Sequence, residues 1–117
     1  MNVPHLPALR LGRSYDSLDK FEVKDHRTGE VKAVVSSVNA GIVRKDLAKI
    51  GASRAALDKF TCAQLIELSA KAGEMFLNGT LPLGDGGHTQ SASQYIETLS
   101  LTSGLPPRFV GIENFLL

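Results

Sequence analysis

The chain of 117 residues is poor in the residue types that build several common kinds of site. It has a single cysteine, which excludes an internal disulfide framework and a multi-cysteine zinc site. Its net charge is +1 and it has no basic run, so no part of it is suited to follow a phosphate backbone. No apolar run approaches the roughly 20 residues that cross a bilayer. We therefore expect neither nucleic acid nor membrane as a partner.

The N-terminus is not expected to carry a secretory signal. Met1-Asn2-Val3-Pro4-His5 has neither the charged start nor the apolar segment of a secretory signal peptide. The expected location is the cytoplasm, where a lone cysteine stays reduced.

What remains is the composition of one ordinary globular domain, with 43% apolar and 21% charged residues. The pattern predicts an α+β fold in three parts. Residues 1–19 form an irregular arm, residues 20–105 form a β-hairpin with two packed helices and a short third helix, and residues 106–117 form an apolar tail.

The hairpin follows from alternation of apolar and polar residues. Phe21–Asp25 alternates with the period of a half-buried strand, and Val31–Val35 continues with β-branched residues. Gly29 between them supplies the positive φ that a tight turn needs. Because a two-stranded hairpin is marginal alone, it is expected to pack on a helix or join a larger sheet. By contrast, Pro4, Pro7 and Gly12 interrupt the arm, which predicts irregular structure there.

Two amphipathic helices are expected after the hairpin. Asn39 is the predicted N-cap of a long first helix, and Thr61 with Gln64 forms the capping box of a second that stops at Asn78-Gly79. The close link around Phe60 predicts an antiparallel or steeply crossed pair. The first apolar face consists of Val43, Leu47, Ile50, Arg54 and Leu57. The second consists of Leu65, Leu68, Ala72, Met75 and Phe76.

The last third of the chain is rich in turn residues. Leu81–Thr89 is expected to be a loop, because it contains one proline and three glycines. Ser91 begins the short third helix, which presents Tyr95 inward and ends near Gly104.

The segment from residue 21 to residue 76 resembles the N-terminal region of the aldehyde dehydrogenase superfamily. Arg27-Thr28-Gly29-Glu30-Val31 matches the core of a characteristic turn in that family, and Ser53–Phe60 and Leu65–Gly73 are similar to its first two helices. The sequence departs from the family where Asp25-His26 replaces an asparagine-proline pair. The Gly84–His88 stretch and the helix from residue 91 to residue 104 are not general features of the family either.

The resemblance implies a parent enzyme with a nucleotide-binding α/β domain, a catalytic α/β domain and an oligomerisation arm. In that family a cysteine attacks an aldehyde and hydride passes to NAD or NADP, but those sites lie downstream of the matching region. The resemblance thus assigns this chain no catalytic, cofactor-binding or metal-binding residue. It implies an N-terminal portion that is inactive alone, a partial α/β oxidoreductase domain. Its partner would be the rest of the enzyme or further copies in a homo-oligomer, and one hypothesis is a truncated or frame-shifted remnant.

Cys62 is the one candidate nucleophile. It would lie in the first turn of a helix, where the partial positive charge of the N-terminus favours the thiolate. Nucleophilic use needs a base nearby, and His5, His26 and His88 are all distant in sequence. A packing role is the favoured interpretation. The three histidines have no metal-ligand spacing and are expected on the surface.

Gly84-Asp85-Gly86-Gly87-His88 is the one candidate binding loop, because glycine-rich loops can present backbone N–H groups to phosphate. Such loops usually follow a strand and open a helix, and the Lys-Ser/Thr pair of nucleotide loops is missing. A turn-rich connection is favoured. Any ligand would meet Asp85 and His88, which are too few for a metal site.

Basic residues on the first helix could suggest an anionic ligand. Lys45, Lys49 and Arg54 lie on or near it, but acidic neighbours such as Asp46 and Asp58 offset them, so a solvated face is favoured.

An alternative function is a small standalone binding or protein-interaction module that only mimics the family. A fragment should show unpaired strand edges and an apolar face without a partner, whereas a standalone module should cover both. Residues 108–117 would then fold back over the face.

Overall fold

The fold is that of a computed structural model, and the structure describes residues 2–110. It contains both helices and strands, so the α+β class is confirmed. Within the described residues, no helix combines the length and the apolar character needed to cross a membrane. The elements are β1 (His5–Leu6), β2 (Ala8–Arg10), β3 (Arg13–Tyr15), β4 (Lys20–Lys24), β5 (Val31–Ser36), α1 (Ala40–Leu47), α2 (Ile50–Leu57), α3 (Cys62–Asn78), β6 (Thr80–Leu83), β7 (His88–Ser91) and α4 (Ala92–Ser103).

The predicted hairpin forms the larger part of a three-stranded sheet. β4 pairs antiparallel with β5, with Phe21 opposite Val35, and Gly29 in the turn has a φ of 72°. On its other side, β5 pairs in parallel with the short β1, so the strand order is β1-β5-β4. The expectation that the hairpin joins a larger sheet is therefore confirmed, and the added strand comes from the N-terminal arm.

The prediction of an irregular arm over residues 1–19 is wrong. That segment contains β1 and a second hairpin, β2–β3, whose turn residues Leu11 and Gly12 both have positive φ. Each of these strands has only two or three residues, which is too short for alternation to be recognised. Their pairing is decided by the turn and by the distant β5.

The prediction of a loop over Leu81–Thr89 is also wrong. β6 and β7 form a third hairpin with Leu83 opposite His88, and only the residues between these strands make the turn. Pro82 lowered the expectation of a strand because proline cannot donate a ladder hydrogen bond. In a ladder of only two strands every position is at an edge, so a proline is tolerated.

The predicted helix starts are confirmed in atomic detail. The Asn39 side chain accepts a hydrogen bond from the backbone N–H of Ile42 at 3.0 Å. Capping boxes are present at both other predicted positions, with Gln64 beside Thr61 and Gln94 beside Ser91. These caps satisfy N–H groups that have no partner within the helix, which fixes where each helix begins.

The first predicted helix is broken in two. Lys49 leaves the helical conformation, with φ −104° and ψ 2°, and its N–H bonds back to the carbonyl of Asp46 at 2.9 Å. Neither Ala48 nor Lys49 is a helix breaker, so the sequence carries no local signal for this break. Gly51 lies inside α2, and a Cβ there would meet nothing within 4 Å, so it serves no close helix crossing.

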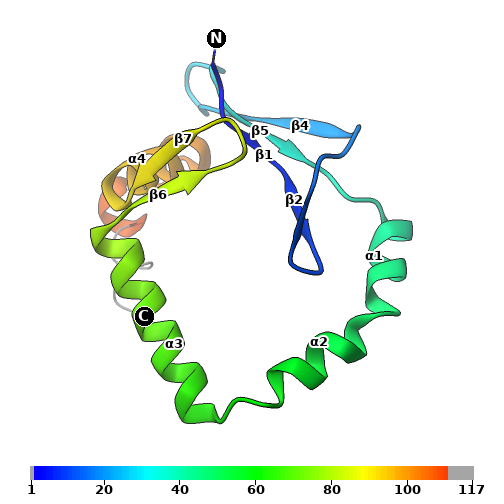
Figure 1. The fold of residues 1–117 in the computed structure, drawn as a ribbon. Helices are drawn as coiled ribbons and strands as arrows, with labels where there is room; N and C mark the ends of the chain where they lie inside the picture. The colour runs from blue at the N-terminus through cyan, green and yellow to red at the C-terminus, as the bar shows by residue number, and fades with distance from the viewer. Residues whose placement is uncertain (1, 111–117) are drawn as a thin grey trace.

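The predicted antiparallel or steeply crossed pair of amphipathic helices does not form. This part of the prediction is wrong. Figure 1 shows α1, α2 and α3 following one another around an open ring that leaves the three-stranded sheet after β5 and ends at the β6–β7 hairpin. Leu57 is 55% exposed, Leu68 50% and Met75 64%, and none of the three helices has a buried residue. The apolar residues of the predicted stripes are present, but many of them are exposed.

The ring closes where α4 meets the sheet and α3. His26, in the turn after β4, donates its backbone N–H to the carbonyl of Leu101 at 2.9 Å, and its Nδ1 lies 2.6 Å from the same oxygen. Phe76 and Tyr95 pack edge to face with ring centroids 5.1 Å apart. Both aromatic residues were predicted to face inward, and here they join α3 to α4.

The core is small for a chain of this length. Among the described residues, only Ala33 and Val110 are buried hydrophobic residues. The radius of gyration is 16.7 Å, whereas a compact domain of this length would have about 13 Å. Val110 belongs to a helical turn over residues 107–110. The remainder of the predicted apolar tail, residues 111–117, lies outside the described residues.

The turn between β4 and β5 is organised by Asp25. Its carboxylate accepts the backbone N–H groups of Arg27 at 2.8 Å and Thr28 at 3.2 Å. These two hydrogen bonds are the main reason that the pKa of Asp25 is lowered from its ordinary value.

This shift predicts a pH dependence of stability. Because the folded-state pKa is lowered, the contribution of Asp25 is fully present above its unfolded pKa of about 3.9 and is lost as pH falls through the folded value. Asp25→Asn keeps an acceptor oxygen but removes the titration. Urea titrations at pH 6 and pH 3 should show the stability advantage of the parent over the variant shrinking at the lower pH. An advantage that is the same at both pH values would contradict the assignment.

Candidate functional site

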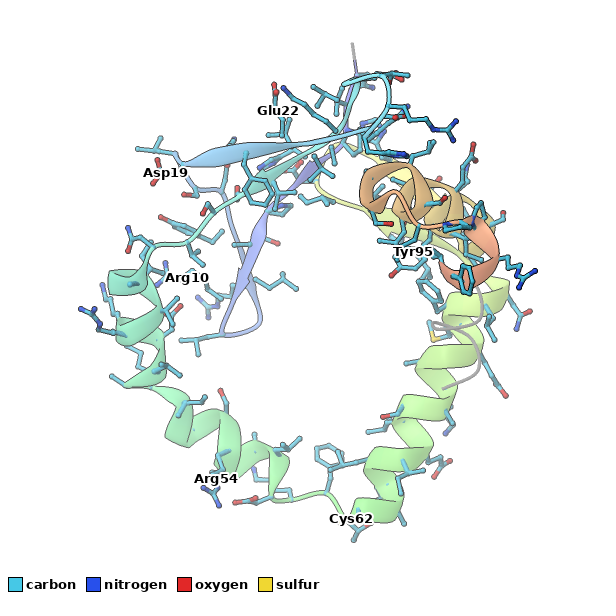
Figure 2. All side chains as sticks on the ribbon, turned by 180° about the vertical axis from the view of Figure 1, so that it is seen from behind. Arg10, Asp19, Glu22, Arg54, Cys62 and Tyr95 are labelled. Atoms are coloured by element: carbon cyan, nitrogen blue, oxygen red, sulfur yellow. The ribbon has the colours of Figure 1, made fainter. Side chains whose placement is uncertain are left out.

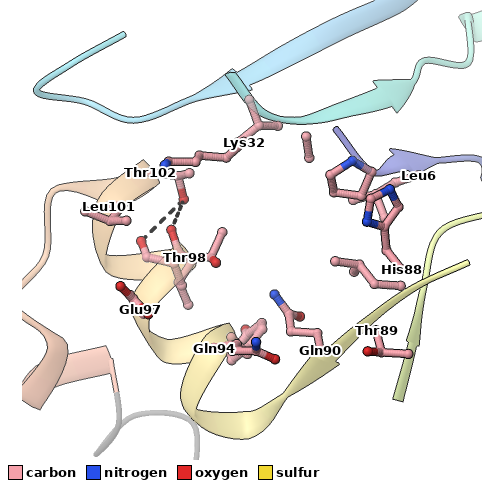
Figure 3. A pocket seen from close by; sticks show the side chains of 16 residues that line it. Leu6, Lys32, His88, Thr89, Gln90, Gln94, Glu97, Thr98, Leu101 and Thr102 are labelled. Atoms are coloured by element: carbon pink, nitrogen blue, oxygen red, sulfur yellow. Dashed lines mark hydrogen bonds between the residues drawn. The ribbon is translucent and has the colours of Figure 1, made fainter. Parts of the chain in front are cut away.

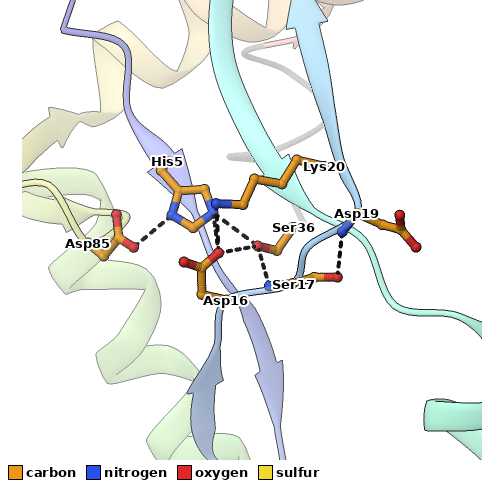
Figure 4. Close-up of polar contacts among 7 residues, drawn as sticks. All are labelled: His5, Asp16, Ser17, Asp19, Lys20, Ser36 and Asp85. Carbon is orange, nitrogen blue, oxygen red and sulfur yellow. Dashed lines mark hydrogen bonds and ion pairs between the residues drawn. The ribbon is translucent and has the colours of Figure 1, made fainter.

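The most connected polar cluster surrounds His5 on β1. Figure 4 shows its ring between Asp85, from the β6–β7 turn, and Ser36, at the end of β5. Nδ1 lies 2.7 Å from an Asp85 carboxylate oxygen and Nε2 lies 2.9 Å from the Ser36 hydroxyl. Asp16 stands 3.5 Å from Nε2. The cluster joins three segments that are far apart in sequence.

The order Asp85, His5, Ser36 is the order of acid, base and nucleophile in serine hydrolases. However, Ser36 is only 6% exposed, and its oxygen also accepts the backbone N–H of Ser17 at 3.1 Å. A nucleophile has to reach its substrate, and this hydroxyl is enclosed by its own hydrogen bonds. The cluster therefore acts as a polar junction, since each buried group is satisfied by another.

Asp16 and Lys20 complete the exposed side of this junction. The Lys20 ammonium lies 2.8 Å from the Asp16 carboxylate. That hydrogen bond is the main reason that the pKa of Asp16 is lowered, with the nearby charge of His5 adding to it. The Asp16 carboxylate is thus held in its charged form next to the imidazole.

The contacts of this junction show what the Gly84–His88 loop, the candidate binding loop, does in the fold. The loop turns between two strands instead of opening a helix, and the Asp85 backbone N–H donates to the His5 carbonyl at 3.1 Å. A Cβ at Gly84 would overlap that same carbonyl oxygen. Glycine is required because the loop backbone lies directly against β1, so the loop is a docking element and not an open phosphate cradle.

A cavity of about 550 Å³ lies between the sheet, the β6–β7 hairpin and α4. Figure 3 shows His88 and Gln90 on one side, Lys32 at the sheet and Glu97 with Thr98 on the helix. Its volume is within the range of small-molecule sites, and apolar side chains contribute to its walls. The apolar lining includes Pro4, Leu6, Val23, Ala33, Leu83 and Leu99.

Lys32 is the basic group of this cavity, and it is already engaged. Its ammonium lies 2.7 Å from the Glu30 carboxylate. That hydrogen bond is the main reason that the pKa of Lys32 is raised, and Glu97 adds a smaller effect in the same direction. The cavity is suited to hold a partly apolar molecule, because apolar and polar side chains share its walls.

Cys62 lies far from these groups. It is exposed at the start of α3. Figure 2 shows it at the end of the molecule opposite Tyr95, away from the sheet. No histidine is close enough to act as its base, so the structure gives it no catalytic environment. Within residues 2–110, no three His, Cys, Asp or Glu side chains gather closely enough to hold a metal ion.

The sequence prediction missed the role of His5, Asp16 and Ser36. His5 was expected on the surface, yet its side chain is 18% exposed and contacts all three partners named above. No spacing rule links residues 5, 36 and 85, because β1 reaches β5 only through parallel pairing. The available signal was the hydrophobic run around Leu6, which indicates a segment that docks.

The docking of the β6–β7 turn gives a testable prediction. Gly84→Ala should lower the free energy of unfolding by at least about 2 kcal/mol, because it adds a left-handed residue and a clash with His5. Gly87→Ala is the matched control. Its φ is 75°, close to the 69° of Gly84, but a Cβ there meets nothing within 4 Å. Equal losses in chemical denaturation would show that the contact with His5 contributes nothing.

Comparison with known proteins found no protein-family model, no curated protein and no solved structure that matches this chain.

Proposed function

We propose that this chain is the N-terminal portion of an aldehyde dehydrogenase-like NAD(P)-dependent oxidoreductase, acting as scaffold and subunit contact and not as a catalyst. The observation that carries the proposal is the uncovered apolar face of α1, α2 and α3. The exposed large apolar residues of these helices are Val43, Leu47, Ile50, Leu57, Ile66, Leu68, Met75 and Leu77.

That amount of apolar surface is unusual for a closed domain. Moving one leucine side chain out of water contributes roughly 1.5–3 kcal/mol. Exposed apolar surface in this amount is typical of contact with another chain or domain. The remainder of an oxidoreductase, or another subunit, would supply the missing cover.

The sheet supports the same proposal. In the described part of the chain, β1 and β4 are the outer strands and each pairs on one side only. β1 covers β5 over just two residues, opposite Val34 and Val35. Free edges of this kind are normally covered or paired in a finished sheet.

The family resemblance also has support at the turn that departs from the family pattern. Asp25 stands where the family has asparagine, and its side-chain oxygen accepts the N–H groups of Arg27 and Thr28. An asparagine oxygen can accept the same two hydrogen bonds, since both residues form such turns. The substitution therefore preserves the local structure that the resemblance requires.

A second candidate function is favoured by the cavity of about 550 Å³ beside α4. Its volume and mixed lining suit a small partly apolar ligand, which would make the chain a standalone binding module. This alternative requires the α1–α3 face to be covered by the chain's own residues.

A charged substitution on the apolar face of α1–α3 distinguishes the scaffold role from the standalone binding module. Leu68→Glu should change the stability of the isolated chain by less than about 0.5 kcal/mol, because the side chain is 50% exposed. It should lower self-association in sedimentation velocity runs. Leu18→Glu is the control, since Leu18 is fully exposed and lies away from the helices. A loss above about 2 kcal/mol at Leu68 would mean that the face is a core, which favours the binding module.

The parentage is tested separately from the scaffold role. The coding sequence downstream of residue 117 should contain, in one of its three frames, a cofactor glycine motif followed by a glutamate and a cysteine typical of aldehyde dehydrogenases. A complete downstream sequence without such a frame would end the proposal of this parent enzyme.

A further inference from the structure

A second cavity, of about 490 Å³, lies between the β2–β3 hairpin and α1. Its walls carry four cationic side chains and one carboxylate: Arg10, Arg13, Lys45, Lys49 and Asp46. We call it the basic cleft. No function assigned above uses it.

The single carboxylate of the basic cleft is already neutralised. Asp46 accepts two hydrogen bonds from Arg10, at 2.7 Å from Nε and 2.8 Å from the terminal nitrogen. This pair is the main reason that the pKa of Asp46 is lowered and that of Arg10 is raised. Along the sequence, Asp46 is expected to offset Lys45 and Lys49. In the structure Arg10 engages this carboxylate most strongly, and Lys45 and Lys49 have only a smaller attraction to it.

Three cations of the cleft are left without a partner. The side chains of Arg13, Lys45 and Lys49 form no hydrogen bond or ion pair with any of the described residues. Several like charges facing one cavity raise the local concentration of anions. The cleft thus carries an excess of three positive charges in a chain whose total net charge is +1.

The positive charges on the β2–β3 hairpin lower its stability. Arg10 and Arg13 are directly opposite each other across the β2–β3 turn, and like charges in that position are destabilising. Leu11 in the turn has a φ of 49°, which costs a non-glycine residue roughly 1–2 kcal/mol. Strain of this kind is typical of functional sites, where the backbone presents a side chain in a fixed place.

The cleft is also preorganised. The Arg10 guanidinium lies over the Tyr15 ring, 4.7 Å from its centroid, while it holds Asp46. The Arg10 guanidinium is held by hydrogen bonds to Asp46 on one side and by the Tyr15 side chain on the other. The floor of the cleft is therefore fixed before a ligand binds. A ligand then meets a fixed floor, while the exposed side chains of Arg13, Lys45 and Lys49 become ordered on binding.

We propose that the basic cleft binds a small molecule bearing a diphosphate group. Three unpaired cations match a group with two or more negative charges, and a single carboxylate would leave most of the charge unmatched. The volume exceeds that of a phosphate ion and falls within the range for whole small ligands. The proposal does not depend on the parent enzyme proposed above.

The test is titration of the full chain with sodium diphosphate at low salt, followed by calorimetry and by backbone amide shifts. Diphosphate should bind at least tenfold more tightly than orthophosphate, with shifts confined to residues 10–15 and 45–49. Affinity should fall at least tenfold when salt is raised from 20 to 200 mM. No binding, or equal affinity for the two anions, would overturn the proposal.

Variants locate the site. Lys49→Gln should weaken diphosphate binding at least tenfold, whereas Lys59→Gln, which removes an exposed lysine outside the cleft, should leave it unchanged. Arg13→Gln should weaken binding while raising the urea midpoint of the free chain, because it removes the like-charge pair with Arg10. Unchanged binding in both cleft variants, or a lower midpoint for Arg13→Gln, would count against the cleft.

Discussion

The contact between His5 and Asp85 holds the two ends of a long excursion of the chain together. Residues 37–79 leave the sheet through α1, follow the ring and return only at β6. Closing a loop of that length costs conformational entropy that the contacts at its base must offset. Those contacts include the polar ones of His5 with Asp85 and Ser36 and of His26 with Leu101, and the aromatic pair of Phe76 and Tyr95. Because they lie at one end of the ring, they do not cover the helices at the other end.

This geometry explains why the side-chain helix caps and buried polar groups are satisfied while few hydrophobic residues are buried. The side-chain N-caps of α1, α3 and α4 are in place, and no buried side-chain nitrogen or oxygen among the described residues lacks a partner. Yet Ala33 and Val110 are the only buried hydrophobic residues in that part of the chain. Hydrophobic burial is the main favourable term in folding, so the apolar stripes of α1–α3 have to be covered by something outside these residues. The proposed scaffold role follows from that requirement.

The sequence predicted what local chemistry controls. The caps at Asn39, Thr61 and Ser91 and the glycine turn at Gly29 were all in place, because each depends on residues within four positions. The sequence did not predict the strands within residues 5–15, the β6–β7 hairpin or the break at Lys49. These depend on pairing between distant segments, such as His5 with Val34, or have no breaker residue to mark them.

The same limit applies to the sites. The glycine-rich stretch from Gly84 was visible in the sequence, but its partner, the carbonyl of His5, was not. The basic residues of α1 were visible too, but their balance was misjudged because Arg10, 36 residues before Asp46, takes that carboxylate. Charge counted along a helix therefore misled, and only the tertiary ion pair shows which cations are left free.

Residues 2–110 do not complete a hydrophobic core by themselves, and the proposed scaffold role depends on this. A urea titration followed by far-ultraviolet circular dichroism, at two protein concentrations tenfold apart, tests it most directly. We predict that the transition is either broad or moves to higher urea at the higher concentration, because uncovered helices melt early or associate. A single steep transition with the same midpoint at both concentrations would contradict the account, since it would mean a self-sufficient domain.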